Sequence, residues 1–296
     1  LGVVHNFALQ CCSYYPNFNR FGSNSICLKR ESNMRCAVNS ITLSLFLLVI
    51  ILPSQARDVK DKGLILYFGF DKENGGEIKD QTGGGHHGDL GKGKINTKEK
   101  VHGSGALEMK DPQSSLEVES FKELEDYQDN SYLFWLYFIE GSNGSWSQII
   151  AKKAPGSDRS PGIWTCPPTL NIHWRFNPGN AGTNCAGPDG EGSQYELKEW
   201  YHIAGIKEKA ELKFYVDGKE VGKYNVPKDH AQGSEKLYIG KTSNYRSATF
   251  IIDDLYVYNR ALEEKEINEV KEGKLLPVEP QDKLAALWAH IKQEAH

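Results

Sequence analysis

One short run of the chain places three polar side chains where they could bind a ligand together. Residues 170–176, LNIHWRF, alternate between apolar and polar types, which predicts a strand with Asn171, His173 and Arg175 on one face. An amide, an imidazole and a guanidinium on a shared face offer the donors and the positive charge that a polar ligand requires. The competing interpretation is a strand face that is simply solvated.

Three aromatic residues near this run could complete a site. Trp164, Trp146 and Tyr195 are expected in or near the loops that adjoin 170–176, where their rings could stack on sugar rings. Together with the polar face, they predict a carbohydrate-binding site. The alternative is that these aromatic side chains fill gaps under a long loop.

Four aspartates have the chemistry of a calcium site. Asp71 and Asp80 flank the first expected turn, and Asp253 and Asp254 lie in the last strongly apolar run. First and last strands of a sandwich often lie close together, so these carboxylates could converge on Ca²⁺, which prefers hard oxygen ligands. Alternatively, Asp80 caps a turn and the Asp253–Asp254 pair faces solvent.

The first strongly apolar segment predicts export. Residues 41–52 form an apolar run of 12 residues, too short to cross a bilayer as a helix. Arg35 precedes this run and the sequence SQA follows at 54–56, which is the pattern of a secretory signal peptide cut after Ala56. We therefore expect a secreted, extracellular protein with no stable membrane span. A buried core helix and an uncleaved membrane anchor are the alternatives.

The signal segment does not begin the chain. Met34 is the first methionine, so we expect 34–56 to be the signal peptide and 1–33 to be an over-extended N-terminus. A long leader sequence is the alternative for 1–33.

Removal of the first 56 residues changes the charge and the cysteine count. The remainder carries a formal charge of about −7, which favours solubility and cation binding over nucleic-acid binding. Four of the 6 cysteines leave with this segment, and only Cys166 and Cys185 remain. Two cysteines in an exported chain predict one disulfide. A free or metal-binding pair is the alternative, although no CxxC spacing favours it.

The elements that must position these residues are mostly strands. Short strand-like runs are separated by glycine-rich turns, and Asp217-Gly218 between two alternating runs predicts a hairpin. This pattern predicts an all-β protein with an antiparallel sandwich or barrel. The expected strands lie at 64–70, 105–110, 115–119, 131–139, 146–152, 170–176, 199–207, 211–216, 219–224, 236–240 and 250–258.

Helical patterns occur only near the end of the chain. Apolar spacing predicts a helix over 262–270 and an amphipathic helix over 281–293, with a proline-containing linker at 275–280 between them. The second helix could pack on the sandwich or dock on another protein.

Several blocks of the chain resemble a known family. The segment WYHIAG at 200–205, the segment FYVDGK at 214–219 and YIG at 238–240 occur in order before IDDLYVYNRAL at 252–262. With the N-terminal glycine-rich turns, this order resembles the laminin-G-like jellyroll module of the concanavalin A-like lectin/glucanase superfamily, over roughly residues 60–272.

The resemblance implies an antiparallel jellyroll β-sandwich of two sheets, in a secreted binding or adhesion module that often carries one calcium. Residues 57–273 are expected to form the jellyroll, and 274–296 a linker and helical tail.

The glucanase branch of that superfamily uses carboxylates spaced as E-x-D-x-E on one strand, and this chain has no E-x-D sequence. The pairs Glu117/Glu119 and Glu123/Glu125 have the two-residue spacing but lack a third acid. We therefore expect no enzyme activity and predict a secreted, non-catalytic module that binds a glycan on a cell surface or matrix. An adhesion or assembly module that docks through 281–293 is the first alternative, and a glycoside hydrolase of the same fold is the second.

Overall fold

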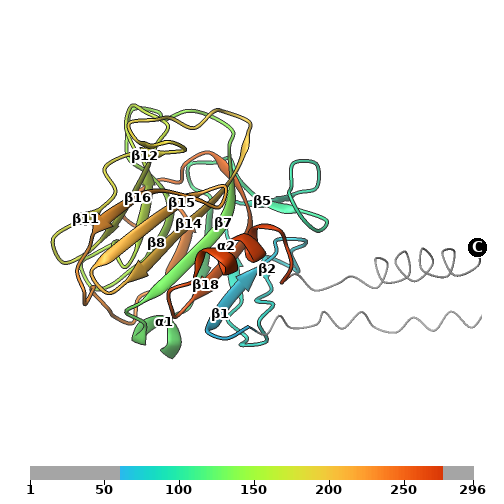
Figure 1. Cartoon of the computed structure of the whole chain (residues 1–296). Coiled ribbons are helices and arrows are strands. Elements are labelled where there is room, and N and C mark those ends of the chain that lie inside the picture. The colour runs from blue at the N-terminus through green and yellow to red at the C-terminus, as the bar shows by residue number, and fades with distance from the viewer. Residues whose placement is uncertain (1–60, 276–296) are drawn as a thin grey trace, which may run out of the picture. The chain divides into compact units, whose positions relative to one another are not determined.

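A computed structural model describes residues 61–275, and strands make up most of that part of the chain (Figure 1). They form two antiparallel sheets that pack against each other, so the predicted sandwich is confirmed. The order of the first sheet is β16 (Lys219–Asn225), β15 (Glu211–Val216), β14 (Trp200–Glu208), β7 (Asn130–Phe138), β18 (Phe250–Tyr258), β5 (Ala106–Met109) and β4 (Lys94–Asn96), with β1 (Leu64–Phe68) also paired to β18.

The second sheet contains the run that the sequence indicates as a candidate site. Its order is β13 (Gly190–Glu191), β12 (Ala186–Gly187), β10 (Ile172–Phe176), β9 (Gly162–Thr165), β8 (Ser147–Lys152), β17 (Leu237–Gly240), β6 (Ser115–Val118), β3 (Gly88–Leu90) and β2 (Glu77–Ile78), with β11 (Ala181–Gly182) also paired to β10. Strands distant in sequence are neighbours here, such as β17 between β8 and β6. These crossovers give the jellyroll topology.

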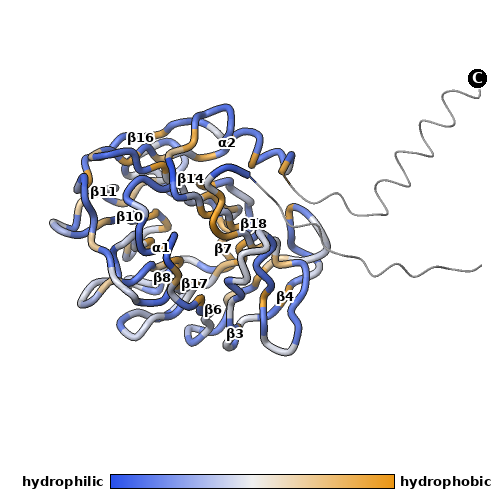
Figure 2. The backbone as a smooth tube through the Cα atoms, turned by 90° about the horizontal axis from the view of Figure 1, so that it is seen from below, coloured by the Kyte–Doolittle hydropathy of each residue, from blue (hydrophilic) through white to orange (hydrophobic). Residues whose placement is uncertain are grey.

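Side-chain alternation along the strands divides core from surface. Ile172, Trp174 and Phe176 point between the two sheets and are fully buried, as the alternation of 170–176 predicts. Figure 2 shows the hydrophobic stretches of β7 and β18 running through the middle of the molecule. The odd-numbered residues of β10 must therefore lie on the outer face of the second sheet.

A tight turn joins β15 and β16 where the sequence predicts a hairpin. Asp217 and Gly218 occupy the turn with positive φ angles of 52° and 81°. Two consecutive positive φ angles are what a two-residue hairpin turn requires, and glycine at its second position is unstrained.

The outer face of the first sheet is partly covered by a helix. α2 (Glu264–Lys271) begins with a capping box between Glu263 and Glu266. Its buried Ile267 and Val270 pack in a second apolar cluster that includes Tyr256 of β18, next to which α2 lies in Figure 1. The remaining helix of the described residues is the single turn α1 (Lys122–Asp126).

Several predictions from the sequence fall outside residues 61–275. These are the N-terminal extension at 1–33, the signal peptide at 34–56 and the helix at 281–293. They stay predictions. Among the described residues, no helix has both the length and the apolar character to cross a bilayer.

The two sheets approach closely where Trp174 meets Gly205. A Cβ atom at Gly205 would lie 2.4 Å from the Trp174 ring, so only glycine allows this approach. The ring also packs against Phe134 at 6.2 Å and Phe214 at 6.0 Å between centroids. Trp174 therefore fills the centre of the core from the second sheet.

We expect Trp174→Ala to lower the free energy of unfolding by roughly 3–5 kcal/mol, because it leaves a large cavity. Gly205→Ala should also destabilise the protein, since its methyl group would overlap the ring. The two effects should not add: Gly205→Ala should cost much less in the Trp174→Ala background. Denaturant unfolding of the two single variants and the double variant measures this, and additive losses would show that the contact does not limit packing.

Candidate functional site

A small pocket lies on the outer face of the second sheet, opposite the core. Its volume is about 180 Å³. Three aromatic rings, one imidazole, one guanidinium and one amide surround it, contributed by Trp146, Trp164, Tyr245, His173, Arg159 and Asn180. We call it the aromatic pocket.

Strand register brings two of these side chains together. His173 in β10 lies directly across from Trp164 in β9, and the two ring centroids are 6.1 Å apart. Trp146 precedes β8 and approaches the other side of the imidazole at 4.7 Å. The imidazole therefore lies between two indoles, one buried and one exposed.

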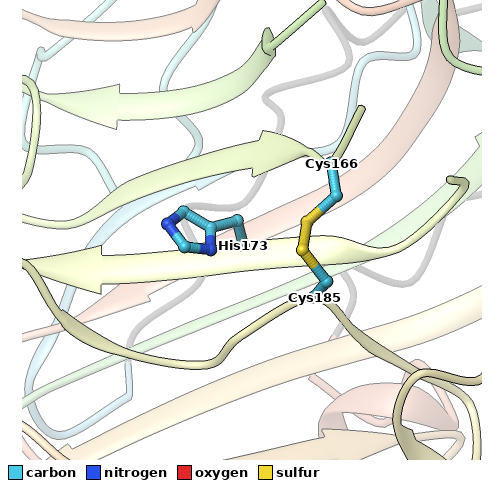
Figure 3. Close-up of side chains that lie close together, drawn as sticks. All are labelled: Cys166, His173 and Cys185. Carbon is cyan, nitrogen blue, oxygen red and sulfur yellow. A yellow bond between two sulfur atoms is a disulfide. The ribbon is translucent and has the colours of Figure 1, made fainter. Parts of the chain in front are cut away.

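A disulfide lies beside His173 of the aromatic pocket. Cys166 and Cys185 are bonded, with their sulfur atoms 2.09 Å apart, so the disulfide predicted from the sequence is confirmed. Figure 3 shows the sulfur atoms beside the ring of His173. The three potential ligand atoms lie within 4.8 Å of one another. A disulfide offers no thiolate, so the group is not a metal site.

Burial keeps His173 uncharged. Burial lowers the pKa of the imidazole to about 4, and the positive charges of Arg175 and Arg159 act in the same direction. At neutral pH, the positive charge around the pocket therefore comes from the two guanidinium groups. The neutral ring has one N–H donor and one acceptor nitrogen, and Arg175 Nε donates to the ring at 3.1 Å.

Arg159 extends over the aromatic floor of the pocket. Its guanidinium carbon lies 5.1 Å from the Trp164 ring centroid, a cation–π contact. Its Nε is buried without a hydrogen-bond partner in the described structure, and so is Nε1 of Trp164. These two buried donors are therefore unsatisfied within residues 61–275.

Arg175 lies beside the pocket on the same strand face as His173. Its Nε donates to the His173 ring at 3.1 Å, and its Nη1 donates to the carbonyl oxygen of Asn180 at 2.7 Å. These contacts fix the loop that follows β10 and bring Asn180 to the rim.

Tyr245 reaches the pocket from a turn that a buried carboxylate anchors. The Asp158 carboxylate accepts from Thr242 Oγ1 at 3.2 Å and from Asn244 Nδ2 at 3.2 Å. Lys153 Nζ lies 3.5 Å from the same carboxylate. The turn in this way holds the Tyr245 ring 5.5 Å from Trp164, and Asp158 is a positioning residue.

Two residues assigned to the site from the sequence do not belong to it. Asn171 is only 1% exposed, because its side chain donates to the Ser193 carbonyl under the covering loop. Tyr195 is 3% exposed and packs in the core against Phe138 at 5.7 Å. Neither lines the aromatic pocket, whereas His173 and Trp164 do and Arg175 lies beside it; a ligand role for these three residues stays a prediction.

A match to a family model identifies the family of the chain. The matched residues include the strands that form the aromatic pocket. A laminin G family model described as "Concanavalin A-like lectin/glucanases superfamily" matches residues 111–268, which is more than half of the chain. The chain belongs to this superfamily. The resemblance inferred from the sequence is thereby confirmed. No match was found among curated protein sequences.

Several solved structures resemble the fold at low identity. The binding domain of Paraclostridial Mosquitocidal Protein 1 is 14% identical with a TM-score of 0.54, over 71% of this chain and 52% of that one. Trypanosoma rangeli sialidase is 15% identical with a TM-score of 0.54, over 73% of this chain and 33% of that one. Domain 4 of AbnA, an extracellular GH43 arabinanase from Geobacillus stearothermophilus, was solved in complex with arabinotriose. It is 16% identical with a TM-score of 0.50, over 70% of this chain and 97% of that one.

These likenesses show the fold. The aligned part spans about half of the mosquitocidal binding domain and a third of the sialidase chain.

The paired glutamates that the sequence offers for glycosidase chemistry lie away from the pocket. Glu117 and Glu119 both contact Lys236 Nζ, at 3.2 and 2.7 Å. Glu125 forms an ion pair with the buried Lys152 at 2.9 Å. These carboxylates neutralise lysines, and none of them lines the aromatic pocket.

A larger hollow lies along β4 and β5, with a volume of about 460 Å³. No aromatic side chain lines it. Two of its three lysines are paired, Lys92 with Asp111 at 3.2 Å and Lys94 with Glu108 at 3.0 Å, and the third is Lys110. Without an aromatic ring on which a ligand could pack, this hollow is a weaker candidate than the aromatic pocket.

The four aspartates proposed for calcium are not gathered at one point. Asp80 is fully buried in its own turn, where its carboxylate accepts from the backbone of Thr82 at 2.9 Å and of His86 at 3.1 Å. Its lone pairs are occupied, so Asp80 is removed from the predicted ligand set.

The other three acids surround the segment 101–104. Asp253 accepts from the backbone N–H of Val101 at 2.8 Å, and Asp71 accepts from Ser104. Asp254 accepts from the Tyr67 hydroxyl at 2.9 Å and contacts His102 Nδ1 at 2.6 Å. Their oxygens have the chemistry that Ca²⁺ prefers, although no three acids within residues 61–275 cluster as ion ligands. Calcium binding stays a prediction for Asp71, Asp253 and Asp254.

Asp253 and His102 should make the stability of the protein depend on pH. Burial, with repulsion from Asp254, raises the pKa of Asp253 to about 8. The hydrogen bond to Asp254 raises the pKa of His102. Folding therefore favours the protonated form of both groups. In the unfolded chain Asp253 loses its proton near pH 4 and His102 near pH 6.5, whereas the folded protein holds both protons to higher pH. The stability that these protons provide therefore falls as the pH rises, and the last part of it is lost between pH 6.5 and 8.

We expect the free energy of unfolding to fall by roughly 1–2 kcal/mol over this pH range. Asp253→Asn should flatten the dependence, because the amide does not titrate. Denaturant melts in buffer containing a chelator measure both slopes. Equal slopes for the wild type and the variant would contradict the assignment.

Proposed function

We propose that this chain is a non-catalytic carbohydrate-binding module and that the aromatic pocket is its ligand site. The observation that carries the proposal is the composition of the lining. Three aromatic rings, an imidazole, an amide and a guanidinium surround the pocket, and no carboxylate does.

Aromatic side chains are suited to sugars because the apolar C–H face of a sugar ring can pack on a flat ring. Trp146 is 40% exposed and is one of two large apolar side chains with high exposure among the described residues. Its indole covers His173 and faces the pocket. A stacked sugar would remove part of this apolar surface from water.

The polar lining would supply hydrogen bonds that orient a sugar. The guanidinium of Arg159 and the amide of Asn180 line the pocket, and sugar hydroxyl oxygens could accept hydrogen bonds from them. The neutral imidazole of His173 adds a group that can accept or donate. Such convergence of a few polar groups among aromatic rings is typical of ligand pockets.

The absence of a carboxylate from the lining favours binding over glycoside hydrolysis. Glycosidases of most families need two carboxyl groups roughly 5–10 Å apart across the scissile bond. Asp158 is the acid that supports the pocket, and its oxygens are held by Thr242, Asn244 and Lys153.

Known proteins of this fold support a carbohydrate ligand. Domain 4 of the Geobacillus stearothermophilus arabinanase was solved with arabinotriose, and the superfamily description names lectins and glucanases. The disulfide between Cys166 and Cys185 supports an extracellular location, because such bonds persist in oxidising compartments. We therefore propose that the module acts outside the cell, on a surface or matrix glycan. The helix at 281–293, which would dock a protein partner in the first alternative, lies outside the described residues.

We expect Trp146→Ala to weaken glycan binding about tenfold or more while leaving the melting temperature nearly unchanged, because the ring is largely exposed. A glycan array identifies the ligand, and calorimetry with the strongest binder measures the loss. Trp200→Ala is the matched control, because Trp200 lies on β14 of the first sheet and should not affect affinity.

Equal weakening by both variants would place the ligand elsewhere. Failure of the wild type to bind any glycan on the array would reject the proposed function.

A further inference from the structure

We infer that the sugar recognised by the aromatic pocket is acidic and that its carboxylate or sulfate group binds between Arg159 and Arg175. This inference rests on the proposed carbohydrate function of the pocket and adds the charge of the ligand.

Arg159 has no ionic partner within residues 61–275. Its guanidinium makes no salt bridge or side-chain hydrogen bond there, and it lies over the face of Trp164 at 5.1 Å. The side chain is only partly exposed, so water does not fully replace the missing partner. A guanidinium has five donors in a planar fork, and leaving a buried one unsatisfied is costly.

Arg175 brings a second positive charge to the same place without an acidic contact. Its donors bond to the neutral ring of His173 and to the carbonyl oxygen of Asn180. Burial lowers the pKa of Arg175, and repulsion from Arg159 acts in the same direction, while Glu191 partly opposes both from a distance. Within the described part of the chain, Glu191 forms no salt bridge with either arginine.

Two other cations in residues 61–275 have carboxylate partners, although the buried ammonium of Lys207 donates to three carbonyl oxygens instead. Arg260 forms two hydrogen bonds with the Glu266 carboxylate, at 2.9 and 2.7 Å. The buried ammonium of Lys152 pairs with Glu125 at 2.9 Å. The whole chain has 39 acidic and 35 basic residues, so acids are numerous enough to have supplied partners for Arg159 and Arg175 as well.

The guanidinium of Arg159 over the Trp164 ring, with that of Arg175 beside the pocket and neither paired with a carboxylate, matches both the ring and the charged group of an anionic sugar. The ring of the sugar would stack on Trp146, and its charged group would accept from the guanidinium forks, which match the geometry of a carboxylate or a sulfate. The absence of acidic lining residues removes the repulsion that would otherwise oppose an anion.

The test compares sugars that differ only in charge. An array should carry matched pairs: an oligouronide and its methyl ester, a sialylated galactoside and its desialylated form, and a sulfated oligosaccharide and its desulfated form. We expect the acidic member of at least one pair to bind at least tenfold more tightly than its neutral partner. The pair that responds distinguishes a carboxylate from a sulfate.

Calorimetry with that acidic glycan then assigns the contacts. Arg159→Gln and Arg175→Gln should each weaken binding about tenfold, and affinity for the wild type should fall as salt is raised, because ions screen the contact. Arg246→Gln is the matched control, since Arg246 is exposed beside Tyr245 but does not line the pocket. Arg159→Gln should change the melting temperature little, because the substitution removes only the cation–π contact with Trp164 and no salt bridge. Arg159→Lys keeps the charge and should retain part of the affinity.

Equal binding of both members in every pair, with Trp146→Ala still weakening it, would overturn the acidic ligand and leave the proposed function standing. Equal effects of Arg159→Gln and Arg246→Gln would overturn the acidic ligand in the same way. If no glycan binds at all, both proposals are rejected.

Discussion

The contact between the Trp174 ring and the backbone of Gly205 sets how closely the two sheets approach, because no other residue type leaves room for the ring at Gly205. Trp174 is fixed in the core from β10, and strand alternation then turns His173 and Arg175 outward. The alternation of β10 therefore determines both the packing of Trp174 in the core and the position of His173 in the aromatic pocket.

The disulfide and the burial of His173 determine the chemistry of the outer face of the second sheet. The bond between Cys166 and Cys185 closes the chain around β10 and lies against the imidazole of His173 (Figure 3). The enclosed imidazole is neutral at physiological pH because burial lowers its pKa. The pocket thus combines uncharged aromatic and imidazole rings with positive charge from arginine alone, a combination that suits a polar, negatively charged ligand better than a cation.

In the first sheet, the buried carboxylate of Asp254 has partners within the chain. Asp254 lies on the last strand, and its carboxylate is satisfied by the Tyr67 hydroxyl from the first strand and by His102. These bonds join β1, the loop at 101–104 and β18, so they stabilise the sheet where the first and last strands of the jellyroll meet. These groups are paired within the chain, whereas Arg159 of the aromatic pocket has no carboxylate partner among residues 61–275.

Local sequence patterns were enough to predict most strands and their faces, because alternation and turn chemistry act over a few residues. The fold class, the hairpin at Asp217, the disulfide and the core position of Trp174 were all predictable for this reason.

Other features depended on contacts between distant segments. β9 is only four residues long, so Trp164 was expected in a loop although it pairs with His173. The remaining pocket residues, Arg159, Asn180 and Tyr245, carry no local signal and meet only through the sheet order. Asn171 has the alternation of a ligand residue, yet a loop buries it, because which loop covers which strand is settled by long-range packing that no local pattern encodes.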